Sequence, residues 1–336
     1  MSTVLRMRFR RLVSIAFPFV LICFLMVGAH GCRKQPASSG PKVKVGYIPF
    51  ANCLPFFVAV EKGYFGKAGV QVEPVKCNDS TEALNALLAG QVDALAGITF
   101  SSYWAAEQEA PGRLKLFLAH YETPDDPFSY LLVPKDSEIK DPNGLRGKQV
   151  GTYTGVSQLL YLRLFLKKVG MEPDKDVKVI QVGSNLQVQA LAAKQFDALF
   201  TVEPYGTIAV LKGAGKVLVA SPRTKYIQNP FWGGAAAVTA TYFKNNKATV
   251  SRLYDAMAEG VRFIRQDTAA AKSYLTKYTP LEPDVASKSG LYKWVLPGEK
   301  FPTQGIQELA DIMASEGVLR NKVSALAMLL TPADLK

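Results

Sequence analysis

The sequence predicts an α/β protein of two lobes, each a mostly parallel sheet flanked by helices. Strand and helix patterns alternate along residues 42–202, which is the order expected of βαβ units. The same order of elements occurs twice within that range. Of the 336 residues, 48% are hydrophobic and 20% are charged, so the chain can bury a sizeable core in each lobe.

The first copy of the pattern contains three expected strands joined by helices. Alternation and β-branched residues predict the strands, while Pro55 and the polar residues Asn78 to Ser80 mark helix starts. The expected strands are 42–48, 70–75 and 92–98, and the expected helices are 55–65 and 80–88.

The second copy repeats this order and part of the sequence. Residues 86–95 and 190–199 agree at seven of ten positions, at an offset of 190 − 86 = 104 residues. Two copies indicate two similar lobes rather than a solenoid, and chance similarity of αβ patterns is the alternative. Asp93 and Asp197 precede strands in the two copies and are expected to be structural. The expected strands are 148–151, 177–182 and 196–202, and the helices are 157–169 and 185–193.

The rest of the chain is expected to return to the first lobe. Helices are predicted at 247–265, 268–277, 283–293 and 304–315, with no strands of their own. Two crossings, near residues 130–134 and 230–238, would then form a hinge. The predicted organisation is a signal peptide at 1–31, a tether at 32–41, lobe I at 42–130 plus 235–336, and lobe II at 131–234.

The N-terminus has the order of a secretory signal. A short basic segment precedes an almost wholly apolar run at 12–29, and small residues lead to Gly31-Cys32. The string 27–32 resembles a bacterial lipobox, which implies acylation of Cys32 and location in the periplasm or on the outer face of the cell membrane. An uncleaved membrane anchor is the alternative. Residues 33–41 are polar and rich in Pro and Ser, as in a flexible tether.

The net charge of +12 does not indicate a nucleic-acid partner. Four of these charges, Arg6, Arg8, Arg10 and Arg11, precede the apolar run, which leaves 12 − 4 = +8 for the remainder. The other basic residues mix with acids, so we expect a mildly basic surface near an anionic membrane.

Two cysteines, Cys53 and Cys77, follow strands that should be adjacent. In an oxidising compartment they are a possible disulfide, if their Cα atoms come within about 7 Å. The alternative is a pair of free thiols lining the cleft.

Ligands of open α/β sheets lie beyond the carboxyl ends of the strands, so the candidate binding residues follow each predicted strand. In lobe I they are Phe50, Asn52, Asn78, Thr99 and Ser101; in lobe II and at the return crossing they are Tyr153, Thr154, Gly155, Ser157, Gln158, Asn185, Glu203 and Trp232.

These residue types are suited to holding a polar ligand. The helix start at 154–158 offers free N–H groups, and Gly155 would allow close approach, although an ordinary helix cap is the alternative. Phe50, Tyr153 and Trp232 offer flat faces unless they belong to the core. Glu203 would accept an N–H donor, unless it only stabilises a helix N-terminus. No Arg follows the predicted strands, which weakens a purely sulfonate-clamping site.

The sequence does not indicate an enzyme. His120 is the one histidine after the predicted signal peptide, and no nucleophile motif or phosphate-binding loop is present. One His and two separated Cys argue against a metal site, and no cofactor is expected.

Five strings in order resemble the periplasmic solute-binding proteins of ABC importers for nitrate, sulfonates, taurine and thiamine-precursor pyrimidines. They are Gly46-Tyr47-Ile48-Pro49, the segment from Pro55 to Phe65, Ala89-Gly90-Gln91-Val92-Asp93, the segment from Leu145 to Gly151, and Glu203-Pro204-Tyr205. Cys53 and Cys77 are not part of that pattern.

The resemblance implies a type II periplasmic-binding-protein fold and an extracytoplasmic substrate-binding lipoprotein. Its ligand would be a small polar organic molecule or anion of the sulfonate, taurine or pyrimidine-precursor type. The expected partners are the ABC permease and ATPase subunits and the membrane, with a monomer as the expected state. The alternatives are a biosynthetic enzyme on the same fold and a ligand-sensing partner of a membrane receptor.

Overall fold

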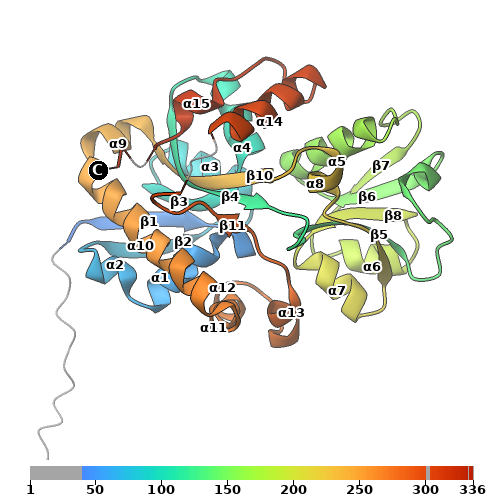
Figure 1. Ribbon diagram of the computed structural model, residues 1–336, viewed down its shortest axis with the longest axis horizontal. Coiled ribbons are helices and arrows are strands. Elements are labelled where there is room, and N and C mark those ends of the chain that lie inside the picture. The colour runs from blue at the N-terminus through green and yellow to red at the C-terminus, as the bar shows by residue number, and fades with distance from the viewer. Residues whose placement is uncertain (1–39, 300–302, 332, 336) are drawn as a thin grey trace, which may run out of the picture. The chain divides into compact units, whose positions relative to one another are not determined.

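A computed structural model of the chain describes residues 40–299, 303–331 and 333–335. The predicted signal peptide, Cys32 and most of the tether lie outside these residues. Two sheets with flanking helices make up the fold, so the predicted α/β class is confirmed (Figure 1). Within the described ranges, no helix has the length and apolar character needed to cross a membrane.

The first sheet has the strand order β11-β4-β10-β3-β1-β2. Strand β1 pairs in parallel with β2 and β3, whereas β10 pairs antiparallel with β3 and β4. Strands β1 to β4 therefore point the same way, and β10 and β11 run against them. The strands are β1 (Lys42–Tyr47), β2 (Gln71–Lys76), β3 (Ala94–Thr99), β4 (Leu114–Glu122), β10 (Phe231–Thr239) and β11 (Lys293–Trp294).

The helices of this lobe come from both ends of the described chain. Those of the N-terminal part are η1 (Ala51–Cys53), α1 (Leu54–Glu61), α2 (Tyr64–Lys67), α3 (Ser80–Leu88) and α4 (Phe100–Glu109). Those of the C-terminal part are α9 (Ala240–Asn245), α10 (Lys247–Gln266), α11 (Thr268–Ser273), α12 (Leu275–Tyr278), α13 (Pro283–Lys288), α14 (Thr303–Ser315) and α15 (Ala325–Met328).

Two helix predictions were too long. The helix expected at 55–65 is divided into α1 and α2, because Gly63 adopts a left-handed conformation with φ 67° between them. The helix expected at 283–293 ends at Lys288, and the chain then extends to form β11.

The second sheet has the order β7-β6-β8-β5-β9. Strand β6 pairs in parallel with β7 and β8, and β5 runs antiparallel between β8 and β9. The strands are β5 (Ser129–Pro134), β6 (Gln149–Tyr153), β7 (Lys178–Val182), β8 (Ala198–Val202) and β9 (Gly215–Ala220). The helices are η2 (Pro142–Leu145), α5 (Val156–Lys168), α6 (Gln187–Ala192), α7 (Tyr205–Leu211) and α8 (Pro222–Tyr226).

The sequence repeat has a structural cause at the start of each sheet. Asp93 Oδ2 accepts the backbone N–H of Lys44 at 2.8 Å, and Asp197 Oδ2 accepts that of Gln149 at 2.8 Å. Each aspartate also donates its own backbone N–H to the carbonyl oxygen of the same partner, at 2.8 Å. Asp93 therefore fixes the register between β1 and β3, and Asp197 fixes the register between β6 and β8.

Helix α10 covers the first sheet and shows why the C-terminal part belongs to lobe I (Figure 1). Its buried residues recur at helical spacing, among them Val250, Leu253, Met257 and Val261. A Cβ atom on Gly260 would lie 2.3 Å from the carbonyl oxygen of Pro55, so glycine permits close contact with α1.

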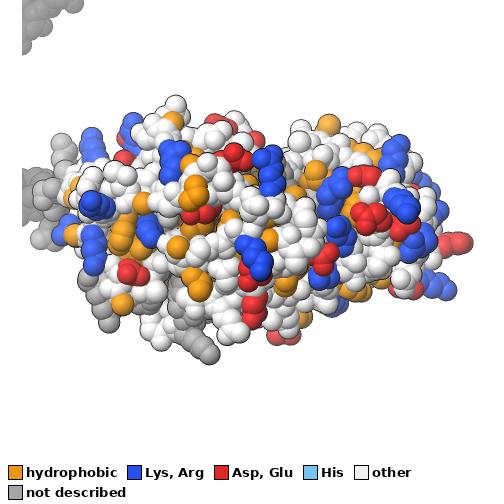
Figure 2. All heavy atoms as spheres, turned by 90° about the horizontal axis from the view of Figure 1, so that it is seen from above, with side chains coloured by type: hydrophobic (Ala, Val, Ile, Leu, Met, Phe, Trp, Pro, Cys, Tyr) orange, Lys and Arg blue, Asp and Glu red, His pale blue; other side chains and the backbone are white. Residues whose placement is uncertain are grey.

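The chain passes between the sheets twice. It leaves the first sheet after Glu122, enters the second at Ser129, and returns between Ala220 and Phe231. The face in Figure 2 mixes Lys and Arg with Asp and Glu over both sheets.

Candidate functional site

A cavity of about 510 Å³ lies where strand ends of the two sheets meet. We call it the Arg223 chamber. Its polar lining residues come from both lobes, and aromatic rings form much of the rest. The lining residues are Ile48, Phe50, Asn52, Asp79, Ser80, Thr81, Thr99, Ser102, His120, Phe128, Tyr153, Thr154, Gly155, Ser157, Gln158, Leu159, Tyr161, Gln181, Val202, Arg223 and Tyr292.

The guanidinium of Arg223 is the one buried cation among the described lining residues. Its Nη2 donates to Gln158 Oε1 at 2.5 Å and its Nη1 donates to Tyr292 Oη at 3.3 Å. Its central carbon lies 4.7 Å from the ring centroid of Tyr161. The Nε–H has no hydrogen-bond partner.

No described carboxylate lies within ion-pair distance of this guanidinium. Glu122 acts on it only at longer range. The Glu122 carboxylate instead accepts hydrogen bonds from Phe128 N at 3.1 Å, Ser129 N at 2.9 Å and Ser129 Oγ at 2.8 Å. The chamber therefore contains a cation whose remaining N–H groups can donate hydrogen bonds to an anion.

The start of α5 supplies a second set of donors. No side chain caps this helix end, and Thr154, Gly155, Ser157 and Gln158 line the chamber there. The Gln158 side chain also donates to the carbonyl of Phe200 at 3.3 Å, so it holds Arg223 against β8.

Three hydroxyls join the lobes at the edge of the chamber. Ser157 Oγ in lobe II lies 2.7 Å from Thr99 Oγ1 and 2.9 Å from Ser102 Oγ, both in lobe I. Thr99 Oγ1 and Ser102 Oγ are 3.0 Å apart. Because each hydroxyl can donate or accept, this cluster can adapt to a bound polar group.

Aromatic side chains form the remaining walls. The rings of Phe128 and Tyr292 are stacked with centroids 3.8 Å apart, and Tyr292 also lies 4.6 Å from the imidazole of His120. Burial lowers the pKa of His120 to about 3, so its imidazole is neutral at physiological pH. Burial raises the pKa of Tyr153 to about 12, so its hydroxyl stays protonated.

The structure brings eight of the predicted residues to this chamber. They are Phe50, Asn52, Thr99, Tyr153, Thr154, Gly155, Ser157 and Gln158. Asn78 and Asn185 line a second cavity instead, together with Phe50. Ser101 is fully buried behind Thr99, to which it donates at 3.2 Å, and its neighbour Ser102 lines the chamber.

Glu203 does not line the chamber, contrary to the prediction. Its Oε1 accepts from Tyr130 Oη at 2.9 Å, from Thr207 Oγ1 at 2.8 Å and from the backbone N–H of Gly290 at 3.1 Å. Its Oε2 accepts from the N–H of Thr207 at 3.2 Å. The carboxylate thus links lobe II to the segment that follows α13, and these four donors surround it.

The free energy of unfolding of Glu203→Gln is expected to increase relative to that of wild type as pH rises. Burial raises the pKa of Glu203 in the folded protein above its ordinary value near 4.3, which applies to the unfolded chain. The stability that this shift contributes is present below the unfolded pKa and is lost as pH rises through the folded pKa. Urea unfolding of wild type and Glu203→Gln between about pH 4 and pH 7 should show the difference moving in favour of the variant. A difference that moves toward wild type would contradict this assignment.

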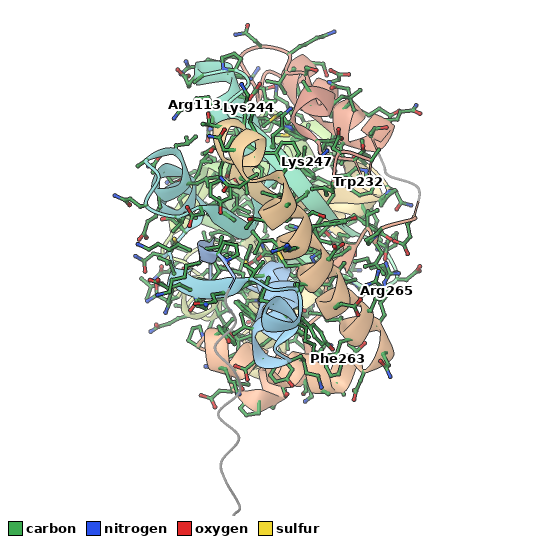
Figure 3. All side chains as sticks on the ribbon, turned by 90° about the vertical axis from the view of Figure 1, so that its left-hand side faces the viewer. Arg113, Trp232, Lys244, Lys247, Phe263 and Arg265 are labelled. Carbon is green, nitrogen blue, oxygen red and sulfur yellow. The ribbon has the colours of Figure 1, made fainter. Side chains whose placement is uncertain are left out.

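Trp232 also lies away from the chamber, because it belongs to β10 and is covered by α14. Its ring centroid is 5.0 Å from that of Tyr121, and a Cβ atom on Gly305 would lie 2.5 Å from its Nε1. Trp232 is labelled in Figure 3. It is a core residue, which was the alternative that the sequence left open.

The possible disulfide is not formed. Cys53 and Cys77 are free and buried, so they do not line the chamber either. Cys53 Sγ donates to the carbonyl of Gly97 at 3.4 Å. Burial raises the pKa of Cys53 to about 12, which keeps this thiol protonated.

Sequence reasoning missed Arg223, Tyr161 and Tyr292 as chamber residues. Arg223 follows β9, a strand that was not predicted although its string 215–220 has β-branched alternation. Recognition of that strand would have placed Arg223 directly after a strand end, among the candidate binding residues. Tyr292 gave no such signal, since it arrives from the C-terminal part of the chain.

Two α/β lobes with a chamber at their strand ends form the fold of substrate-binding proteins. A family model described as NMT1/THI5 like matches residues 51–271. The chain therefore belongs to the NMT1/THI5-like family, as the resemblance in its sequence predicted.

Known proteins share its fold and parts of its sequence. The structure of the periplasmic aliphatic sulphonate binding protein SsuA from Escherichia coli superposes with a TM-score of 0.72 at 18% identity, over 87% of this chain and 92% of that one. YtlA of Bacillus subtilis, named as a putative binding protein, is 24% identical over 285 residues, which are 83% of each chain. A pyrimidine phosphate synthase of Saccharomyces cerevisiae, THI13, is 28% identical over 163 residues, 47% of this chain and 45% of its own.

Proposed function

We propose that this protein is the extracytoplasmic substrate-binding component of an ABC importer and that it captures a small organic anion in the Arg223 chamber. This proposal rests on the buried guanidinium of Arg223, which has unused donors and no ion-pair contact with any carboxylate of the described residues. A buried charge is costly unless a counter-charge or hydrogen bonds compensate it. A ligand anion would supply both.

The surroundings of Arg223 support an anionic head group with a planar or apolar body. The uncapped start of α5 adds N–H donors and a positive helix end, and the hydroxyls of Ser157 and Thr99 can turn toward an acceptor. The stacked rings of Phe128 and Tyr292 suit the body. A sulfonate, as named for SsuA, or a carboxylate would fit this donor set.

Both lobes supply part of the chamber, which supports capture by closure. Asn52 and Thr99 come from lobe I, whereas Arg223 and Ser157 come from lobe II. A ligand that contacts both sets favours the closed form by its extra contacts there. One copy carries all of these walls, so a monomer suffices, and the closed form would be presented to the permease and ATPase subunits.

Mass spectrometry of small molecules released from the purified, denatured protein tests this proposal. We expect one organic anion in the wild-type sample and its loss from the Arg223→Gln sample. The released molecule should rebind and be recovered unchanged after incubation. A cationic ligand would contradict the proposal. A chemically altered product would favour a synthase-type activity such as the one named for THI13.

We also propose that the protein is anchored by acylation of Cys32, on the strength of the apolar run and the Gly31-Cys32 junction. Cys32→Ser is expected to release the mature protein from membranes or to block its processing, because serine offers no thiol for acylation. Membrane fractionation and intact mass measure this, with Cys53→Ser as the control that keeps the anchor. Full membrane retention of a normally processed Cys32→Ser protein would refute acylation.

A further inference from the structure

A second cavity of about 800 Å³ lies beside the Arg223 chamber. We call it the Tyr205 chamber. The loops after β1 and β2 contribute residues to both cavities, for example Asp79 to the first and Asn78 to the second. Strands β7 and β8 border the first cavity with Gln181 and Val202, and the loops that follow them line the second. Among the residues that the structure describes, Phe50 alone lines both of them. The two cavities are thus neighbouring parts of one space between the strand ends.

Two aromatic rings from opposite lobes lie close together where the two cavities meet. The ring centroid of Phe50, in the loop after β1, lies 6.4 Å from that of Tyr205, at the start of α7. Tyr205 lies a further 6.4 Å from Tyr153, which lines the Arg223 chamber. These centroid distances are within the range of aromatic pairs.

Short-range bonds hold Phe50 at this boundary. Its backbone N–H donates to the carbonyl of Ile48 at 2.8 Å, and its carbonyl accepts from the N–H of Cys53 at 3.1 Å. Asn52, two residues on, is tied to the carbonyl of Gly97 at 3.0 Å. The loop that carries the ring is therefore fixed to β3 rather than free to move with a ligand.

The two chambers differ in chemistry. The Arg223 chamber contains the buried guanidinium and the hydroxyl cluster. The Tyr205 chamber combines apolar side chains such as Val188, Ile208 and Leu281 with neutral polar ones, and its basic lining residue, Lys212, is exposed. The neutral polar residues are Asn78, Ser184, Asn185 and Gln189. An anion with an extended chain would place its head in the first chamber and its tail in the second, if the rings did not stand between them.

We propose that Phe50 and Tyr205 determine ligand length: they close the Arg223 chamber against the Tyr205 chamber, so that only anions short enough for the first are bound. This rests on the proposed function, since the head group must be held at Arg223. It assigns these two rings as specificity-determining residues and the Tyr205 chamber as the space that their removal would open to a longer ligand.

A series of linear alkanesulfonates from one to eight carbons tests the proposal by calorimetry. Affinity for wild type should rise with the first carbons and then fall sharply once the chain reaches the rings of Phe50 and Tyr205. In Phe50→Ala and in Tyr205→Ala the rise should continue, by roughly threefold to fourfold for each CH₂ that enters apolar surroundings. Phe263→Ala, which truncates a phenylalanine on α10 (Figure 3), is the matched control and should keep the wild-type length limit.

The double variant Phe50→Ala/Arg223→Gln shows whether the long ligand is still held by its head. It should lose the long sulfonates that Phe50→Ala gains. The same length limit in wild type, Phe50→Ala and Tyr205→Ala would overturn the proposal. So would long sulfonates that bind Phe50→Ala/Arg223→Gln as tightly as Phe50→Ala, because the Tyr205 chamber would then be an independent site.

Fluorescence of anilinonaphthalenesulfonate provides a measurement that does not depend on alkanesulfonate affinity. The body of this sulfonate could extend into the Tyr205 chamber only where the ring at position 50 is missing, so the signal should be larger with Phe50→Ala than with wild type or Phe263→Ala. Equal signals would overturn the division into two chambers. Failure of the proposed function would give a different result. The length limit for alkanesulfonates would then be the same in wild type and in the ring variants, and the ligand released from wild type would not be an anion.

Discussion

Replacing Arg223 by glutamine is expected to weaken binding of the released anion by about a hundredfold to ten-thousandfold. A hydrogen bond to a charged group contributes about 1.5–3 kcal/mol, and a guanidinium can give two of them to one anionic head. Glutamine keeps the polarity of the site but supplies neither the charge nor the paired donors. Isothermal titration with the ligand identified by mass spectrometry measures the change.

Two further variants separate loss of the head-group contact from loss of the fold. Arg223→Lys keeps the charge without the planar pair of donors, so its affinity should fall between those of wild type and Arg223→Gln. Arg163→Gln removes an exposed arginine that pairs with Asp174 and should bind as wild type does. Wild-type affinity in Arg223→Gln would move the anion site elsewhere.

The parts of the fold that repeat locally could be predicted from the sequence. The strand that begins at Lys42 is bonded to Asp93, and the strand that begins at Gln149 is bonded to Asp197. Each aspartate stands just before the neighbouring strand, and the sequence around it is similar in the two lobes. Strand-end loops follow directly once such strands are known, which is why the helix start at Thr154–Gln158 was placed correctly at the chamber.

The parts that depend on distant segments could not be predicted in this way. Arg223 reaches the chamber because β9 pairs with β5, and Tyr292 because the segment after α13 returns to the hinge. Glu203 precedes a proline in the sequence, but its four donors come from Tyr130, Thr207 and Gly290. A charge that looks available in sequence is fully used when such partners converge on it in space.

Gly290 is the position where a single methyl group is expected to disturb both stability and binding. A Cβ atom there would lie 1.9 Å from the carbonyl oxygen of Pro127, which belongs to the first crossing between the sheets. The neighbouring N–H groups tie this segment down: that of Gly290 donates to Glu203 at 3.1 Å and that of Leu291 to Asp126 Oδ1 at 3.4 Å. Relief of the clash must move the segment and break these bonds.

Gly290→Ala should therefore lower the free energy of unfolding by about 2–4 kcal/mol, from overpacking and from donors left unpaired. Affinity for the anion should fall by about tenfold as well, because Tyr292 lies two residues on and contacts Arg223. Urea unfolding and calorimetry on the same sample measure the two effects. Gly66→Ala in α2 is the matched control, since a Cβ atom there meets nothing within 4 Å, and it should keep affinity and raise stability by up to about 1 kcal/mol. Equal stability and affinity in Gly290→Ala and wild type would mean that the segment after α13 does not hold Tyr292 against the chamber.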